Sequence, residues 1–462
     1  MASEQNKPRQ LFGTDGIRGV AGEYPLNRAT VYAIGRALGT RLKRRMENPS
    51  VVLGQDTRES SAWIAEAVAL GLRDAGCGYA SAGVVTTPGL AYLTRTHGFA
   101  AGVVVSASHN PWQDNGIKLF GANGMKLADE IEHEIEQEIF SHLDQIAAAE
   151  PPAGNIADIL PGAAHLRADY EQWLAASIDA AAVKPLRILM DCANGAASVL
   201  APELFTRLGV KFEALHTAPT GRNINDGCGA LHPEHVAQEI AKRPGEFDLG
   251  VTFDGDADRA LFSDAQGNVV NGDSVLLVAA RQMKSRGSLR NDTVVATTMS
   301  NMGLEKALRS SGIAMLRSDV GDKYVLEQML KTGATLGGEQ SGHILFMDGD
   351  STTGDGLLTA LRVMEVIATS GKSLLELTAD FKVFPQRMKN VKVREKVPMK
   401  ELPTVMEAIA AAERELDGNG RVIVRYSGTE RLARVMIEAD DEALMHKHVD
   451  AVAAALEQAI GA

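Results

Sequence analysis

Three aspartates stand at alternate positions of one short segment: Asp254, Asp256 and Asp258, directly before Arg259. Carboxylates at this density repel one another unless a cation lies between them. A calcium-binding EF-hand loop does not fit, because its sixth position here is Arg259 in place of glycine and its twelfth is Ala265 in place of glutamate. A magnesium site that also receives a phosphate oxygen fits better, and the alternative is a turn with solvated aspartates.

A serine, an imidazole and an ammonium are expected together at the end of another strand. Val103–Val105 is a β-branched run typical of a buried strand, and Ser108 and His109 follow it in a polar loop. We predict a tight turn at Asp114–Gly116 and a returning strand whose Lys118 points back towards the loop. Open α/β sheets bind ligands at such strand ends, although the stretch alone could be a polar hairpin without chemistry.

Two further polar loops suit the two ends of a sugar phosphate. Glu339, Ser341 and His343 offer acceptors and donors from a glycine-flanked loop, as a ligand with many hydroxyls requires. The second loop offers guanidinium, hydroxyl and backbone N–H groups to one anion; its members are Arg425, Ser427, Gly428, Thr429 and Arg434. Either loop alone could be structural, but a sugar phosphate would use all four polar segments.

These segments interrupt a regular alternation of expected strands and helices. The alternation runs through three successive stretches and predicts βαβ units with mostly parallel sheets, whereas the last stretch suggests a small α+β domain. Leu11–Val20 is expected to form a glycine-rich turn that holds Asp15 and Arg18, and Ser60 to cap a helix. The Pro, Gly and Ala content of Ala147–Pro161 predicts a linker.

Length and composition narrow the class of protein. The 462 residues are enough for several domains, and 45% hydrophobic and 23% charged residues are ordinary for a soluble globular protein. A net charge of −12 argues against a nucleic-acid or membrane partner. The three cysteines are widely spaced, MASEQNKPRQ lacks the apolar core of a secretory signal, and we find no run that could span a bilayer. We therefore expect a cytoplasmic protein.

Taken in order, these motifs resemble those of the α-D-phosphohexomutase superfamily over essentially the full chain. They are FGTDGIRG at 12–19, SASHNPWQDNGIK at 106–118, NINDGCGALHPE at 223–234, DGDADR at 254–259, VGDKYV at 320–325, GGEQSGH at 337–343 and RYSGTE at 425–430. The forms GTDGIRG, NINDGCG and GEQSGH are most similar to the bacterial branch that acts on glucosamine phosphates. Two positions depart from the family pattern: Ala257 stands where glycine is usual and Arg431 where proline is usual.

The resemblance implies a four-domain, heart-shaped α/β architecture around a deep cleft. Three α/β mixed-sheet domains would be followed by a smaller C-terminal α+β domain. The implied divisions are a phosphoserine-loop domain at 1–158, a metal-binding domain at 159–262, a sugar-binding domain at 263–374 and a phosphate-binding domain at 375–462.

The resemblance also implies a reaction. Ser108 would carry a phosphate, and Mg²⁺ would be held by a phosphoserine oxygen and by Asp254, Asp256 and Asp258. Glucosamine 6-phosphate and glucosamine 1-phosphate would interconvert through a 1,6-bisphosphate that turns within the cleft. Arg18, His109 and Lys118 would stabilise the phosphoryl group, and one of these basic groups would take the hydroxyl proton. The remaining roles are loop positioning by Arg259, sugar binding by Glu339, Ser341 and His343, and phosphate binding by Arg425, Ser427, Gly428, Thr429 and Arg434.

The implied partners are small molecules. They are the phosphosugar substrate and an activating hexosamine 1,6-bisphosphate or glucose 1,6-bisphosphate. The protein would be a monomer or homodimer, primed by a kinase or by autophosphorylation, and would feed UDP-N-acetylglucosamine synthesis. Three alternatives stay open: a preference for mannose or glucose phosphates, a metal-dependent sugar-phosphate phosphatase with a Ser/His pair, and a silent sugar-phosphate-binding protein.

Overall fold

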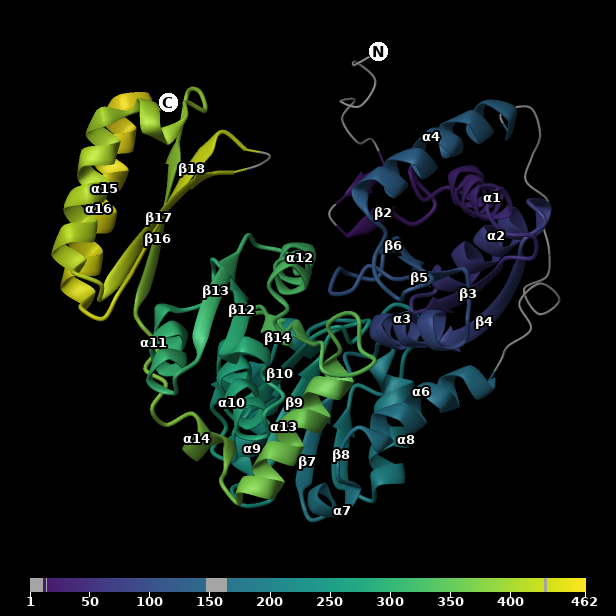
Figure 1. Ribbon diagram of the computed structural model, residues 1–462, viewed down its shortest axis with the longest axis horizontal. Coiled ribbons are helices and arrows are strands. Elements are labelled where there is room, and N and C mark those ends of the chain that lie inside the picture. Colours follow the sequence, from purple (N-terminus) through teal and green to yellow (C-terminus); the bar gives the residue numbers. More distant parts are fainter. Residues whose placement is uncertain (1–10, 14, 147–163, 428–429) are drawn as a thin grey trace. The chain divides into compact units, whose positions relative to one another are not determined.

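The computed structural model describes residues 11–13, 15–146, 164–427 and 430–462 (Figure 1). By compactness the chain divides into two units. The first comprises Met1–Met299 and Met315–Thr378, and the second comprises Ser300–Ala314 and Ala379–Ala462. The expected linker at Ala147–Pro161 lies outside the described residues.

The first sheet of the first unit is mixed and six-stranded. Its order is β1 (Phe12–Gly13), β2 (Gly16–Val20), β6 (Asp114–Gly121), β5 (Ala101–Val105), β3 (Ser50–Gln55) and β4 (Gly78–Val84). Strand β3 runs parallel to β4 and β5, whereas β6 runs antiparallel to β5 and β2. The C-terminal end of β5 therefore faces the start of β6, where the polar loop joins them.

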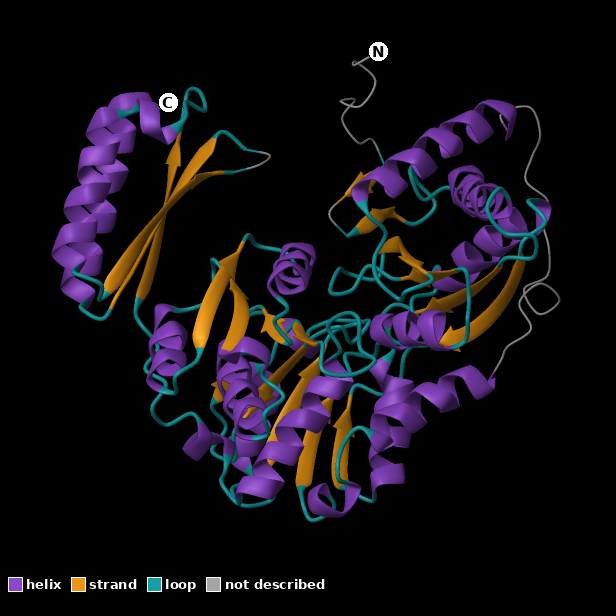
Figure 2. Ribbon diagram, viewed as in Figure 1, coloured by secondary structure: helices purple, strands orange, loops and turns teal. Residues whose placement is uncertain are grey.

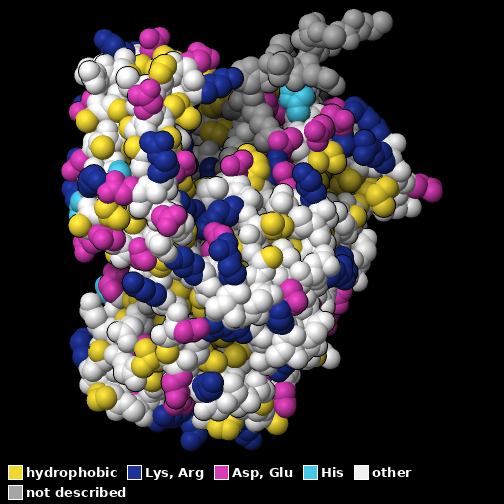
Figure 3. All heavy atoms as spheres, turned by 60° about the vertical axis from the view of Figure 1, so that its left-hand side comes forward, with side chains coloured by type: hydrophobic (Ala, Val, Ile, Leu, Met, Phe, Trp, Pro, Cys, Tyr) yellow, Lys and Arg dark blue, Asp and Glu magenta, His cyan; other side chains and the backbone are white. Residues whose placement is uncertain are grey.

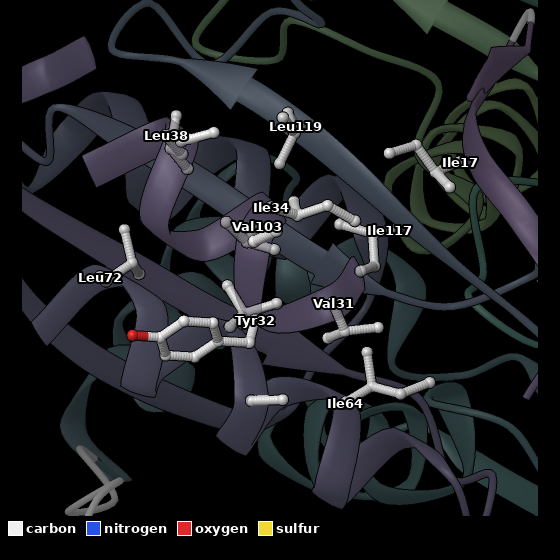
Figure 4. Packing of buried hydrophobic residues seen from close by; sticks show 14 of the residues in the cluster. Ile17, Val31, Tyr32, Ile34, Leu38, Ile64, Leu72, Val103, Ile117 and Leu119 are labelled. Carbon is white, nitrogen blue, oxygen red and sulfur yellow. The ribbon is translucent and has the colours of Figure 1, made fainter. Parts of the chain in front are cut away.

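Helices cover both faces of this sheet. The alternation along the strands sends Val51 and Val103 into a core shared with Ile34 of α1 (Arg28–Lys43) and Ile64 of α2 (Ser61–Asp74), joined by residues of α4 (Asp129–Ile146) (Figure 4). The opposite face packs on α3 (Thr87–Thr96), where Gly102 lies against Leu90. Lys118 pairs with Val104, out of phase with Val103, and so belongs to the α3 face.

Two local predictions for this sheet are wrong. Asp114–Gly116 is the start of strand β6 rather than a turn, and Leu11–Val20 contains strands β1 and β2. Both differences have one cause, because β2 pairs antiparallel with β6 across a long sequence separation. Ser60 stands at the N-cap position of α2, as predicted, but its side chain makes no capping hydrogen bond in the described part of the chain. Its Oγ accepts from Nδ2 of Asn115 at 2.8 Å.

Two more mixed sheets complete the first unit (Figure 2). The second has the order β11 (Val269–Val270), β10 (Ala260–Ser263), β9 (Leu249–Phe253), β7 (Arg187–Asp191) and β8 (Lys211–Leu215), with helices α6 (Ala164–Ala176), α7 (Ala180–Val183), α8 (Ala197–Leu208) and α9 (Glu234–Lys242). The third has the order β13 (Ala314–Ser318), β12 (Thr293–Thr297), β14 (Leu336–Gly338) and β15 (Ile344–Phe346), with helices α10 (Gly272–Ser285), α12 (Asp322–Thr332), α13 (Gly356–Ser370) and α14 (Leu374–Leu377). The antiparallel additions β10 and β15 were not predicted.

The second unit is a small α+β domain, as predicted. Its antiparallel sheet has the order β16 (Gln386–Lys392), β18 (Leu432–Ala439) and β17 (Gly420–Tyr426), and its helices are α11 (Met302–Ser310), α15 (Pro403–Leu416) and α16 (Glu442–Ile460). Val435 and Ile437 of β18 pack against Val449 and Val452 of α16 in its core.

Among the described residues, no helix has the length and apolar character needed to cross a membrane. On the face drawn in Figure 3, basic and acidic side chains are interspersed. The three cysteines, Cys77, Cys192 and Cys228, are all buried free thiols.

Asp355 joins distant parts of the first unit. It caps α13 by accepting from the backbone N–H of Leu358 at 3.0 Å, and it accepts from the hydroxyl of Tyr170 in α6 at 2.8 Å. Burial raises the pKa of Asp355 from 3.8 to about 6. Between about pH 4 and pH 6, the folded chain therefore keeps a proton on Asp355 that the unfolded chain has already released.

We expect the free energy of unfolding to fall by up to about 3 kcal/mol through this group as the pH rises from about 4 to about 6. The protonated carboxyl contributes fully below its unfolded pKa, and the contribution is lost as the pH passes its raised folded pKa. Urea unfolding of wild type and Asp355→Asn between pH 4 and 7 measures the difference, because asparagine caps helices as well as aspartate does. If the free energies of unfolding of the two proteins changed with pH in the same way, Asp355 would not be the group responsible.

Candidate active site

Ser108 is buried at the C-terminal end of β5 with its hydroxyl against the acidic segment. Its Oγ donates a hydrogen bond to Oδ2 of Asp254 at 2.6 Å and lies 3.4 Å from Nδ1 of His109. Its backbone φ of 52° is a left-handed conformation, uncommon outside glycine. Such a conformation persists only where the surroundings hold it.

Buried polar side chains hold the Ser108 loop through its carbonyl groups. Arg58 pairs with Asp56 at 2.8 Å and donates to the carbonyl oxygen of Ser108 at 3.0 Å, and Nδ2 of Asn225 donates to the same oxygen at 2.9 Å. Gly255 permits the acidic segment to approach, because a Cβ there would lie 2.5 Å from the Ser108 carbonyl oxygen. The serine is therefore fixed against the segment that follows β9.

The carboxylates of Asp254, Asp256 and Asp258 converge, with one oxygen of each within 4.8 Å of the others. All three are buried, and Oδ1 of Asp256 and Oδ1 of Asp258 have no hydrogen-bond partner in the described part of the chain. Burial and the charges of Asp258 and Asp256 raise the pKa of Asp254 well above its usual value. Hard, unpartnered oxygen donors that repel one another fit a divalent cation such as Mg²⁺.

Strand β6 brings Lys118 to this triad. Its Nζ lies 2.9 Å from Oδ2 of Asp256, 3.6 Å from Oδ2 of Asp258 and 3.1 Å from Oδ2 of Asp15. Burial would lower the pKa of Lys118, but the three carboxylates raise it well above its usual value. Burial would conversely raise the pKa of Asp256, which Lys118 lowers to about 2. Lys118 is thus held as a charged ammonium.

Two guanidiniums flank the imidazole of His109. Nη1 of Arg259 lies 3.1 Å from Nδ1 of His109, and Arg18 donates to Oδ1 of Asn110 at 3.4 Å and pairs with Asp15. Burial and then the charge of Arg259 lower the pKa of His109. The neutral imidazole is therefore favoured, and the cationic character comes from the arginines and Lys118.

A cavity of about 390 Å³ opens beside these groups. Its wall includes Arg18, His109, Asp258, Arg259, Glu339 and His343. The β14–β15 loop is anchored beside the acidic segment at 254–259, because Ala260, the next residue, donates its N–H to the carbonyl of Gly342 at 3.1 Å. His343 is buried, and neither of its ring nitrogens has a hydrogen-bond partner among the residues that the structure describes. Exposed Ser341 lies on the same loop.

Ala257, which stands where the family pattern usually has glycine, has a left-handed backbone conformation with φ of 51°. A non-glycine residue pays about 1 to 2 kcal/mol for this backbone. The carbonyl of Ala257 accepts from the N–H of Gly356 at 3.0 Å, so the start of α13 supports the strained residue.

Three of the predicted phosphate-binding residues, Arg425, Ser427 and Arg434, lie on the β17–β18 hairpin of the second unit. Arg425 and Arg434 are directly opposite across the antiparallel pair, where like charges repel, and Nη2 of Arg434 lies 3.6 Å from the carboxylate of Glu430. Nε of Arg434 is buried without a hydrogen-bond partner in the described chain. Lys396, which was not predicted, donates to the carbonyl of Ser427 at 2.6 Å. Two members of the predicted set lie outside the described residues: Gly428 and Thr429.

Three charged residues beside the cavity were not predicted as part of the site. Asp15 pairs with Lys118 and with Lys126, and Lys126 also pairs with Asp322. Asp322 in turn lies 3.9 Å from Nε2 of His343. Asp15 and Asp322 fall within the quoted motifs at 12–19 and 320–325, which could have drawn attention to them, whereas Lys126 falls within none.

Models of one protein family match most of the chain. Four models of the phosphoglucomutase/phosphomannomutase family match in order: alpha/beta/alpha domain I at residues 9–145, alpha/beta/alpha domain II at 168–267, alpha/beta/alpha domain III at 271–384 and the C-terminal domain at 388–455.

Individual related proteins show to which branch of this family the chain belongs. A phosphoglucosamine mutase of Koribacter versatilis is 66% identical over 457 residues, which cover 99% of this chain and 98% of that protein. The chain belongs to the phosphoglucosamine mutases. Another member of this family, from Deinococcus radiodurans, is 46% identical over 450 residues, covering 97% of this chain and 98% of its own. The family resemblance inferred from the motifs is confirmed.

Solved structures of phosphohexomutases share the fold of this phosphoglucosamine mutase family member. A phosphoglucomutase/phosphomannomutase family protein of Burkholderia thailandensis aligns with a TM-score of 0.76 at 24% identity, covering 97% of each chain. The Aspergillus fumigatus N-acetylphosphoglucosamine mutase, solved with GlcNAc-6P and magnesium, aligns with a TM-score of 0.66 at 20% identity, covering 97% of this chain and 96% of its own. At these identities the likeness concerns the fold.

Proposed function

We propose that this chain is an isomerase that interconverts glucosamine 6-phosphate and glucosamine 1-phosphate through phosphoserine 108 and a 1,6-bisphosphate. The observation that carries the proposal is the buried Ser108 hydroxyl, which lies 2.6 Å from Asp254 in a triad whose Asp256 pairs with the ammonium of Lys118 at 2.9 Å. A nucleophilic oxygen, a cation site and fixed positive charge at one cavity are the parts that phosphoryl transfer requires. Membership of the phosphoglucosamine mutases supports glucosamine as the sugar, and the product would feed UDP-N-acetylglucosamine synthesis.

Mg²⁺ is the metal that we propose, held by the three aspartates of the triad and an oxygen of phosphorylated Ser108. The unpartnered oxygens of Asp256 and Asp258 support this assignment. When bound, the ion neutralises the carboxylates and draws negative charge from the phosphoryl group. The related Aspergillus fumigatus enzyme was likewise solved with magnesium.

In the proposed reaction, the anomeric hydroxyl oxygen of glucosamine 6-phosphate bonds to the phosphorus on Ser108 as the P–Oγ bond breaks. The hydroxyl proton passes to a basic group of the cluster, and the product is the 1,6-bisphosphate. After this intermediate turns, Oγ of Ser108 attacks its other phosphorus, and the released C6 oxygen takes up a proton. Glucosamine 1-phosphate leaves, and the phosphoserine is restored.

The side chains around Ser108 take separate roles in this proposal. Lys118 and Arg18 stabilise the charge of the phosphoryl group, and His109 lies within reach of Oγ. Arg259 positions the loop through its 3.1 Å contact with His109. The sugar hydroxyls are bound by Glu339, Ser341 and His343, and the phosphate that is not transferred by Arg425, Ser427, Gly428, Thr429 and Arg434.

We extend the proposal to organisation and partners. The domains are bounded at 1–158, 159–262, 263–374 and 375–462, and the last domain hinges so that the bisphosphate can turn. Glucose 1,6-bisphosphate or hexosamine 1,6-bisphosphate serves as activator, and a kinase or autophosphorylation primes Ser108. The protein is a monomer or homodimer and acts in the cytoplasm, where buried free thiols such as Cys192 persist.

Turnover on glucosamine, glucose and mannose 6-phosphates, each with its matching bisphosphate, tests the proposal. We expect kcat/KM for the glucosamine substrate to exceed the others by about tenfold or more, with little inorganic phosphate released. A preference for mannose or glucose phosphates would change the assigned substrate. Stoichiometric phosphate release would instead indicate a phosphatase.

A further inference from the structure

Lys126 lies between two carboxylates that come from different sheets of the first unit. Its Nζ pairs with Oδ1 of Asp15, beside the first sheet, and with Oδ2 of Asp322, at the start of α12. All three side chains are shielded, with about a fifth of each exposed: 20% for Lys126, 23% for Asp15 and 21% for Asp322. Ion pairs in such partly buried surroundings are screened less than surface pairs.

The two oxygens of Asp15 have different partners. Oδ1 accepts from Lys126, whereas Oδ2 pairs with Nη2 of Arg18 and with Nζ of Lys118 at 3.1 Å. Arg18 and Lys118 are the cations that we assign to the transferring phosphoryl group. One carboxylate therefore contacts both cations, and for Arg18 it is the charged partner, whereas Lys118 is also held by Asp256 at 2.9 Å.

The backbone holds Lys126 in place for this contact. Lys126 forms a β-bridge with Phe120 of strand β6, after a turn closed by the N–H of Gly121 donating to the carbonyl of Met125 at 2.9 Å. The carbonyl of Gly124 in this turn accepts from Oγ1 of Thr352 at 2.6 Å. The backbone of Lys126 is therefore held by hydrogen bonds, and this fixes the position from which its side chain extends to Asp15.

We propose that Lys126 is a positioning residue for phosphoryl transfer: by holding Oδ1 of Asp15, it directs Oδ2 towards Arg18 and Lys118. The inference rests on the proposed mutase activity and assigns no contact between Lys126 and the substrate. Without the ammonium, the carboxylate of Asp15 turns about its Cβ–Cγ bond, and Arg18 loses its ion-pair partner and keeps the longer contact with Asn110 at 3.4 Å. Displacement of a phosphoryl-binding group by about 1 Å costs on the order of a hundredfold in rate.

The test compares Lys126→Met with wild type in the full chain, with Mg²⁺ and glucose 1,6-bisphosphate present. We expect kcat to fall by about 10- to 100-fold while KM for glucosamine 6-phosphate changes by less than about threefold, because a charged group that acts in the transition state is displaced. Intact mass gives a second readout: phosphate uptake by Ser108 from the bisphosphate slows by a similar factor. Lys126→Arg, which can still bridge two carboxylates, restores most of both rates.

The chain offers a matched control in Lys323. Its Nζ pairs with Asp129, so this ion pair joins the same two segments, the start of α4 and the start of α12, without touching Asp15. Lys323→Met is expected to keep wild-type kcat and phosphate uptake. Equal losses in Lys323→Met and Lys126→Met would show that Lys126 only holds the segments together, and would overturn the proposal.

Asp15→Asn tests the ion pair between Lys126 and Asp15 by changing its carboxylate, and it provides the test if Lys126→Met does not fold. It should lower kcat at least as far as Lys126→Met, and the double variant should be no slower than Asp15→Asn alone. Fully additive losses, or a Lys126→Met kcat within about twofold of wild type, would overturn the proposal. Absence of mutase turnover in wild type would refute the proposed function itself, a result distinct from either.

Discussion

Replacement of Ser108 by alanine is expected to abolish turnover, with kcat reduced by at least about 10⁴-fold. The change removes the oxygen that we assign as phosphate carrier and leaves the loop held as before. The carbonyl of Ser108 still accepts from Arg58 and Asn225, and its N–H still donates to Oγ of Ser106. Because alanine meets about the same backbone strain as serine at this φ, folding should be little affected.

Intact mass after incubation with glucose 1,6-bisphosphate is the decisive measurement. Wild type should gain the mass of one phosphate, and Ser108→Ala should gain none. Ser341→Ala is the matched control, because we assign Ser341 to sugar binding in the same site, and it is exposed on the β14–β15 loop. Its mass gain should persist while KM rises. A gain retained by Ser108→Ala would place the phosphate on another residue.

The sequence predicted the parallel framework of the fold well, because local patterns specify it. The predicted strand at Val103–Val105 lies within β5, and the expected alternation of strands and helices runs through all three sheets of the first unit. The errors concern antiparallel additions. Strands β2 and β15 contain glycine or are only a few residues long, and their partners, rather than their own periodicity, determine that they are strands.

The candidate site was predictable where chemistry is concentrated in one segment. Alternating aspartates identified the triad, and the polar loop after Val103–Val105 identified Ser108, whose role as phosphate carrier came from the resemblance. The structure brings Ser108 within 2.6 Å of Asp254. Residues that act through distant partners gave no such signal. Arg58 donates to carbonyl groups about 50 residues away, and Lys126 pairs with Asp322 almost 200 residues away. These contacts follow from how the sheets pack, which periodicity and spacing do not encode.

Asp254→Asn is expected to stabilise the metal-free protein while it removes both the response to magnesium and the activity. Asp254 is fully buried beside two further carboxylates, and its raised pKa reflects the cost of a charge there. Asparagine removes the charge and keeps both contacts, since its oxygen can accept from the N–H of Arg259 and its amide can donate to Oγ of Ser108. The free energy of unfolding without metal should rise by about 1 to 3 kcal/mol, and kcat should fall by about 10³-fold.

Thermal unfolding in chelator and across a MgCl₂ titration separates the two effects. Wild type should gain stability as MgCl₂ rises, because an ion that binds only the folded state stabilises it. Asp254→Asn should be more stable than wild type in chelator, and its stability should not change with MgCl₂.

Asp264→Asn is the control: this buried carboxylate lies after β10 and accepts from the N–H groups of Gln266 and Asn268. Its loss should lower stability at every magnesium concentration and leave the response intact. A metal-free Asp254→Asn less stable than wild type would mean that the triad is not under mutual repulsion. The site would then lack the electrostatic reason for binding a cation.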